Sequence, residues 1–199
     1  MINPLSSSLV LYNEIMDTLN KLIESKETNE LKKARVLSGL EEKAKKIKSH
    51  NLALGFCALG SIAAMRKNIK EMHRYHKAAL QERPDPDFFF NYANSLAGCG
   101  LLEDAMTYAK VSYDLNPARS DVIDFLIKLS QDLDDTKSFL RYAAAWEKLT
   151  DEPHESYEQY LLYIQEQNEI ADFCMLTSES SLAEVWNTPE EDEAWSHLQ

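Results

Sequence analysis

The chain has 199 residues and a formal net charge of −12, and 44% of its residues are hydrophobic. This hydrophobic share is enough to bury a core, whereas no apolar run approaches the roughly 20 residues that a membrane-spanning helix needs. The chain contains only 5 Gly and 6 Pro, which disfavours β-rich folds because they use both residues in many tight turns. The composition predicts an all-α protein, and the N-terminus lacks the features of a secretory signal, so we expect it in the cytoplasm.

The negative charge is concentrated in the last quarter of the chain. Residues 1–148 contain all 21 Lys and Arg and 20 acidic residues, whereas residues 149–199 contain 13 acidic residues and no Lys or Arg. The last segment therefore carries a charge of −13, which repels nucleic acid and attracts basic protein surfaces. We expect a basic protein as its partner, with no direct binding of nucleic acid and no membrane association.

Two apolar stripes at helical spacing precede residue 51. The first stripe consists of Leu9, Tyr12, Met16, Leu19 and Ile23. The second consists of Leu31, Ala34, Leu37, Leu40, Ala44 and Ile47. The polar break between them, with Thr28 placed to cap the second helix, predicts a helical hairpin over residues 1–50. We expect this hairpin to cap the helices that follow, and a homodimer formed through it is the alternative.

Two later segments have the same pattern in the same register. They end at Pro84 and Pro117, 33 positions apart, and align without a gap. The first segment has an aromatic residue, Leu and Gly near its start, namely Phe56, Leu59 and Gly60. The second segment has two aromatic residues and Ala at the same positions, namely Phe89, Tyr92 and Ala93. The second unit adds Gly100 at the expected inter-helix turn and a small residue, Ala105, where its two helices would cross. This pattern resembles the tetratricopeptide repeat.

The resemblance implies a solenoid of helical hairpins. A third, looser unit covers residues 120–153, with a turn at residues 133–135 and with Phe139 where the family usually has a small residue. Residues 154–169 have apolar positions at helical spacing and are expected to form a capping helix. We therefore predict an N-terminal hairpin (1–50), a solenoid of about three repeats with its capping helix (51–169) and an acidic tail (170–199).

In this family the first helices of the repeats line a groove that receives peptides. The resemblance places ten residues on that face: Leu54, Cys57, Ser61 and Met65, then Phe90, Asn91 and Asn94, and finally Asp124, Lys128 and Gln131. Asn can hold a peptide backbone because its amide both donates and accepts hydrogen bonds. Family members that clamp a chaperone carboxylate use Lys with Asn. Cys57 and Ser61 occupy the corresponding positions of the first unit, which argues against such a clamp here.

The last part of the acidic tail, residues 181–199, combines acidic residues with two Trp side chains. Its candidate binding residues are Leu182, Val185, Trp186, Glu190, Glu191, Asp192, Trp195 and Leu198. Trp is a frequent interface anchor, and acidic neighbours orient docking on a basic partner. The tail resembles the toxin-binding tails of small bacterial type II antitoxins, which implies neutralisation of a basic toxin, often a ribonuclease. Another protein partner, or folding of the tail onto the chain's own repeats, are the alternatives.

The sequence offers no catalytic constellation. His73 and His76 are spaced to share a helix face, but no third metal ligand accompanies them. A Gly-rich phosphate loop, an HExxH motif and a nucleophile elbow are all missing. The three cysteines, Cys57, Cys99 and Cys174, are far apart and lie among apolar residues. We expect a protein-binding chain without enzymatic activity, cofactor or metal, whose tail binds a basic partner. A scaffold or secretion-type chaperone that binds a peptide in the groove is the alternative.

Overall fold

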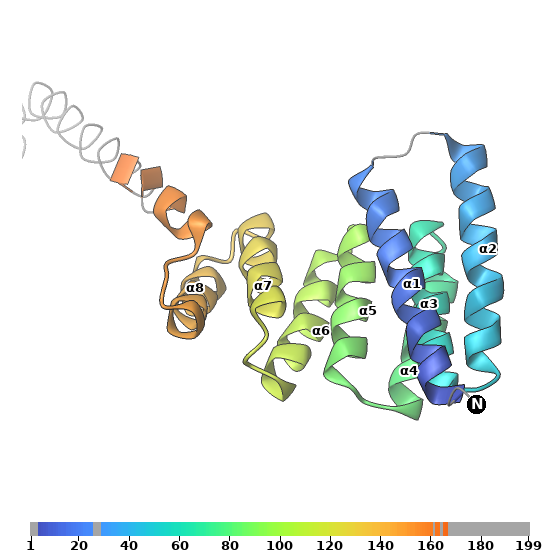
Figure 1. Cartoon of the computed structure of the whole chain (residues 1–199). Coiled ribbons are helices and arrows are strands. Elements are labelled where there is room, and N and C mark those ends of the chain that lie inside the picture. The colour runs from blue at the N-terminus through green and yellow to red at the C-terminus, as the bar shows by residue number, and fades with distance from the viewer. Residues whose placement is uncertain (1–3, 26–28, 161, 164, 167–199) are drawn as a thin grey trace, which may run out of the picture. The chain divides into compact units, whose positions relative to one another are not determined.

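A computed structural model describes residues 4–25, 29–160, 162–163 and 165–166 (Figure 1). The chain divides into two compact units, residues 1–151 and residues 152–199. In the second unit the described residues are helical over 155–160, 162–163 and 165–166. No described helix in either unit has the length and apolar character that a membrane crossing requires.

The described part of the first unit consists of helices joined by short turns. In chain order they are α1 (Pro4–Glu24), α2 (Glu30–Lys48), α3 (Leu52–Met65), α4 (Ile69–Glu82), α5 (Pro86–Gly98), α6 (Leu102–Leu115), α7 (Ser120–Asp132) and α8 (Thr136–Thr150). None of the described residues belongs to a strand. The prediction of an all-α fold is confirmed.

The helices pack in adjacent pairs. Helices α1 and α2, α3 and α4, α5 and α6, and α7 and α8 each form a pair, as Figure 1 shows. Each pair also packs on the next, because α3 contacts both α2 and α5, and α7 contacts α6. The N-terminal pair shares one core with the helices that follow it, since Leu40 and Ile47 of α2 are buried in the same cluster as Leu54 and Leu59 of α3.

Polar side chains fix where several helices begin. Asn51 and Asn68 accept hydrogen bonds from the backbone N–H groups of Leu54 and Glu71, at 3.1 and 3.2 Å. These bonds satisfy N–H groups that lack a partner within the helix. Helix α2 is capped by Asn29, which accepts from Lys32 N at 3.0 Å. The predicted cap at Thr28 was therefore wrong by one position.

Helix α3 is apolar on nearly all sides and forms the centre of the N-terminal core. Eleven of its 14 residues are buried. Small residues let neighbouring helices approach it closely: a Cβ atom added at Gly55 would lie 2.4 Å from the Cα of Lys48 on α2, and one added at Gly60 would lie 2.6 Å from the His76 ring on α4. The residue type at these positions thus determines how closely the helices pack.

The apolar stripes of the first two helices are only partly buried. Tyr12, Leu19 and the unpredicted Ile15 are buried in α1, whereas Leu9 and Ile23 are 50% and 59% exposed. In α2, Leu31 is 83% exposed. In α1 the buried face runs through Ser8, Tyr12, Ile15 and Leu19, so Leu9 and Ile23 lie beside this face and not on it. Leu31 lies in the first turn of α2, ahead of the buried residues of that helix.

Candidate protein-binding groove

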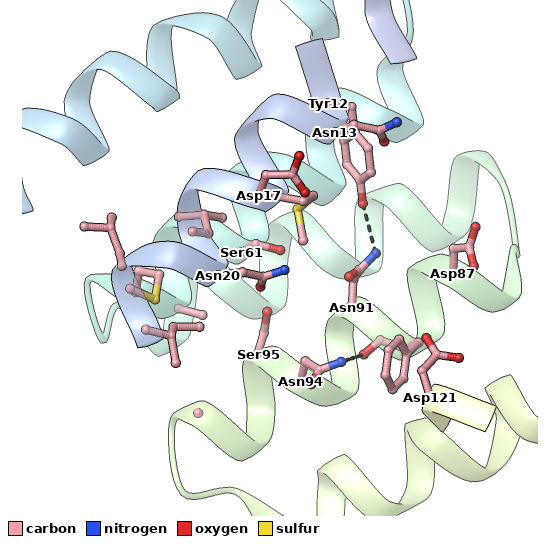
Figure 2. A pocket seen from close by; sticks show the side chains of 18 of the residues that line it. Tyr12, Asn13, Asp17, Asn20, Ser61, Asp87, Asn91, Asn94, Ser95 and Asp121 are labelled. Carbon is pink, nitrogen blue, oxygen red and sulfur yellow. Dashed lines mark hydrogen bonds between the residues drawn. The ribbon is translucent and has the colours of Figure 1, made fainter. Parts of the chain in front are cut away.

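A groove of about 790 Å³ lies between α1 and α5 and is hereafter called the α1–α5 groove (Figure 2). Its sides come from α1 and α5, and Ser61, Ala64 and Met65 of α3 also line it. Further residues contribute at its ends, among them Lys33, Lys67, Arg119 and Asp121. The lining is mixed, with amide, hydroxyl and charged groups beside apolar side chains.

The α1 side of the groove carries a polar row. Asn13, Asp17 and Asn20 line it and are exposed. Their spacing of four and three residues places them on one helix face. Ile15 and Leu19 are apolar and buried. Their burial orients α1 so that its polar row faces the groove.

The α5 side presents Phe90, Asn91, Asn94 and Ser95. Asn94 Nδ2 donates to the backbone carbonyl of Phe90 at 3.1 Å. The Phe90 ring packs edge-on against Phe125 of α7, with centroids 5.4 Å apart. Figure 2 shows Asn91 and Asn94 on the same stretch of α5, facing the space beside Asn20 of α1.

A hydrogen bond joins the two sides of the groove. Asn91 Nδ2 donates to the Tyr12 hydroxyl at 2.9 Å, and that hydroxyl lies 3.3 Å from the Cys57 sulfur of α3. Burial raises the pKa of the Cys57 thiol to about 12 and raises the pKa of Tyr12 well above its usual value. Both groups are therefore neutral at physiological pH, and Cys57 is held as an unreactive thiol.

The groove end at the start of α5 and α7 is organised by Arg119. Its guanidinium forms ion pairs with Asp87 and with Asp121, the latter at 2.6 Å, and lies 4.9 Å from the centre of the Phe90 ring. Only 20% of the Arg119 side chain is exposed. The acidic residues at this end thus have both a cation and the N-termini of helices to balance them.

The other end lies where α1, α3 and α5 terminate. Lys33 and Lys67 line it, and Lys67 donates from Nζ to the carbonyl oxygen of Gly98, the last residue of α5. A cation is favourable at the C-terminal end of a helix because the last carbonyl groups have no helical partner. The end of α5 therefore accounts for the charge of Lys67 at this end of the groove.

A buried histidine lies directly behind the α5 side. His76 Nε2 is 2.9 Å from Ser95 Oγ, and the His76 ring stacks on Tyr92 at 4.8 Å. Burial lowers the pKa of His76 to about 3, so it is neutral. His73 contacts the Tyr92 hydroxyl instead of sharing a ligand with His76. The described residues contain no group of His, Cys, Asp and Glu side chains suited to a metal ion.

The structure brings together part of the residue set expected in a groove. Phe90, Asn91, Asn94, Ser61 and Met65 line the α1–α5 groove. Leu54 and Cys57 are instead buried beneath α1. Lys128 does not line it, and its ammonium pairs with Asp124 at 2.8 Å on the same helix.

Sequence reasoning missed the whole α1 side of the groove. The signal was present, because Asn13, Asp17 and Asn20 form a polar row along a helix that is otherwise largely apolar. The tail residues from Leu182 to Leu198 lie outside the described residues. No known protein family and no curated protein sequence matches the chain.

Proposed function

We propose that this chain is a non-catalytic, protein-binding module of the tetratricopeptide type that holds a partner segment in the α1–α5 groove. The observation that carries the proposal is the groove itself, in which several polar side chains surround a partly apolar space of about 790 Å³. Sites of this size and mixed lining are typical of ligand-binding clefts. The cytoplasm is the location that fits this proposal.

The periodicity of the helices supports the repeat assignment. The first helices of the three pairs begin at Leu52, Pro86 and Ser120, 34 positions apart each time. The turns inside the pairs share a left-handed residue near the same register, with φ of 56° at Lys67, 80° at Gly100 and 52° at Asp134.

Equivalent aromatic pairs recur in the first two units. Phe56 stacks on Tyr75 with centroids 6.2 Å apart, and Phe89 stacks on Tyr108 at 6.3 Å. Both partners are shifted by 33 positions from one unit to the next. Equivalent contacts at an equivalent spacing are expected of stacked repeats.

The acidic tail is the basis of a second proposal. The charge of −13 over residues 149–199 and the two residues Trp186 and Trp195 favour docking on a basic protein, in the manner of a bacterial antitoxin. This activity is compatible with a groove that binds a different segment or a different partner.

Co-purification from the native cell tests both proposals with matched variants. The full chain is compared with Asn94→Arg, which places a long side chain in the groove, and with Thr107→Arg, the same kind of change on the exposed face of α6. A fourth sample lacks residues 178–199. Circular dichroism of each variant checks that the helices are retained.

The groove proposal expects a partner that is lost with Asn94→Arg and retained with Thr107→Arg. The tail proposal expects a small basic partner that is lost only when residues 178–199 are removed. A partner retained by all of the variants would contradict both proposals.

A further inference from the structure

We propose that the α1–α5 groove takes an extended segment of a partner protein and that a Lys or Arg side chain of this segment pairs with Asp17. This inference rests on the proposed protein-binding function and specifies the ligand class of the same groove. The sides of the groove complement such a segment in charge and in hydrogen-bonding groups.

Asp17 is a charged groove residue that the fold does not use. The acidic residues at one end, Asp87 and Asp121, are both paired with Arg119, and Lys67 donates to the carbonyl oxygen of Gly98 at the end of α5. Asp17 lies in the middle of α1, far from either helix end, and within the described part of the chain its carboxylate has neither a hydrogen bond nor an ion pair. An exposed carboxylate in a groove attracts a cationic group.

The amides of the α5 side offer free acceptors. Asn91 uses its amide nitrogen on the Tyr12 hydroxyl and also lies within hydrogen-bonding reach of the Cys57 thiol. Asn94 uses its amide nitrogen on the Phe90 carbonyl. The amide oxygens of both residues remain to accept hydrogen bonds from a ligand.

A ligand that fits these acceptors must be rich in donors. The backbone N–H groups of an extended segment are unpaired and can donate to Asn91 and Asn94, whereas those of a helix are already used internally. Asn13 and Asn20, which flank Asp17 on α1 and have no hydrogen bond from their side chains to other described residues, can bond to the same backbone. The apolar side chains of Met16, Ile23 and Met65 also line the groove and offer contacts for an aliphatic residue or for the stem of a Lys.

A random heptapeptide library displayed on phage tests the inference, with the full chain as the immobilised target. Selected peptides are synthesised with a fluorescent label, and their dissociation constants are measured by fluorescence anisotropy. Asp17→Asn removes the charge and keeps the side-chain size, whereas Asp17→Glu keeps the charge. Glu24→Gln is the matched control, because it removes one charge from the same helix at a residue that does not line the groove.

The expected result is enrichment of Lys or Arg among peptides that Asn94→Arg excludes. Asp17→Asn should weaken their binding about tenfold, the usual scale for a hydrogen bond to a charged group. Asp17→Glu should restore most of the affinity, and Glu24→Gln should leave it unchanged.

Other outcomes overturn the inference in distinguishable ways. Groove-binding peptides that are acidic or uncharged, or that bind Asp17→Asn as well as the parent chain, would refute the Asp17 pairing and leave the groove as a protein-binding site. Failure to select any peptide that Asn94→Arg excludes would refute the proposed function as well. A dimer in analytical ultracentrifugation that Asn94→Arg dissociates would assign the groove to a second copy of the chain and would also refute the pairing.

Discussion

The side-chain amide of Asn91 donates to the Tyr12 hydroxyl at 2.9 Å across 79 positions of the sequence. This contact links α1 to α5 over the buried helix α3, where Cys57 lies directly beneath the hydroxyl. It connects helices from different pairs and so fixes one boundary of the α1–α5 groove.

We expect Tyr12→Phe to lower the free energy of unfolding by about 1–2 kcal/mol, because the partly buried amide of Asn91 loses its acceptor. Asn91→Ala should cost a similar amount, and the two losses should not add in the double variant. Urea denaturation of the four proteins measures this coupling. Tyr75→Phe is the control, since the Tyr75 ring stacks on Phe56 and no hydrogen bond of its hydroxyl is seen among the described residues. An additive double variant would show that the Tyr12–Asn91 bond contributes nothing.

Two glycines, the buried Gly55 of α3 and the exposed Gly39 of α2, should respond in opposite directions to the same substitution. A Cβ atom at Gly55 would lie 2.4 Å from the backbone of Lys48, whereas one at Gly39 would meet nothing within 4 Å. Gly55→Ala should therefore lower the free energy of unfolding by about 2–3 kcal/mol through overpacking. Gly39→Ala should raise it by about 0.5–1 kcal/mol, because Ala is the better residue in an exposed helix interior. Thermal denaturation of both variants shows whether each substitution raises or lowers the stability. A stabilising Gly55→Ala would contradict the close packing of α2 on α3.

The sequence predicted the helical pairs where local chemistry determines the structure. The prolines at 84 and 117 follow the helices α4 and α6, and Gly100 lies in the predicted turn with φ of 80°. The turn predicted at residues 133–135 also lies between two helices. Proline and glycine constrain the backbone by themselves, so their effect can be recognised without tertiary information.

The orientation of α3 could not be predicted, because the helix has no polar face. Its segment is apolar nearly throughout, and periodicity therefore does not show which side faces a neighbour. As a result, Leu54 and Cys57 were placed in the groove, although α1 covers them. The α1 side of the groove was missed for a different reason. The polar row on α1 can be read from the sequence, but the position of α1 beside α5 depends on contacts between residues that are 79 positions apart.

Acid should destabilise the protein through His76. Burial lowers the pKa of His76 from 6.5 to about 3, so between these values the unfolded chain binds a proton that the folded chain does not. The contribution of His76 to the free energy of unfolding is therefore fully present above about pH 7 and is lost as the pH falls through 6.5 toward 3. Between pH 7 and pH 5 the loss should be about 2 kcal/mol.

The His76→Gln variant isolates this effect from that of the carboxylates. Gln can still bond to Ser95 but does not titrate, so the difference in unfolding free energy between pH 7 and pH 5 should shrink by about 2 kcal/mol relative to the parent chain. Urea denaturation at the two pH values provides the measurement. An equal pH dependence in both proteins would mean that His76 is protonated in the folded state.

Arg119 and Arg74 should differ in their tolerance of lysine. Both guanidinium groups lie over a ring, Arg119 over Phe90 and Arg74 over Tyr75. Arg119 also bridges two carboxylates and is 20% exposed, whereas Arg74 pairs with one carboxylate and is 61% exposed. A lysine ammonium cannot reproduce a planar group that bonds two carboxylates and stacks on a ring. Arg119→Lys should therefore lower the free energy of unfolding by about 1 kcal/mol, and Arg74→Lys should change it by less than about 0.5 kcal/mol.

Salt separates the contributions at Arg119. In 0.5 M NaCl the ion pairs of Arg119 weaken, so the difference in unfolding free energy between the parent chain and Arg119→Lys should become smaller. It should not vanish, because the contact with the Phe90 ring is less sensitive to screening. Thermal denaturation at low and high salt gives both values. If Arg119→Lys is as well tolerated as Arg74→Lys at low salt, the cluster of Arg119, Asp87 and Phe90 does not hold α5 against α7.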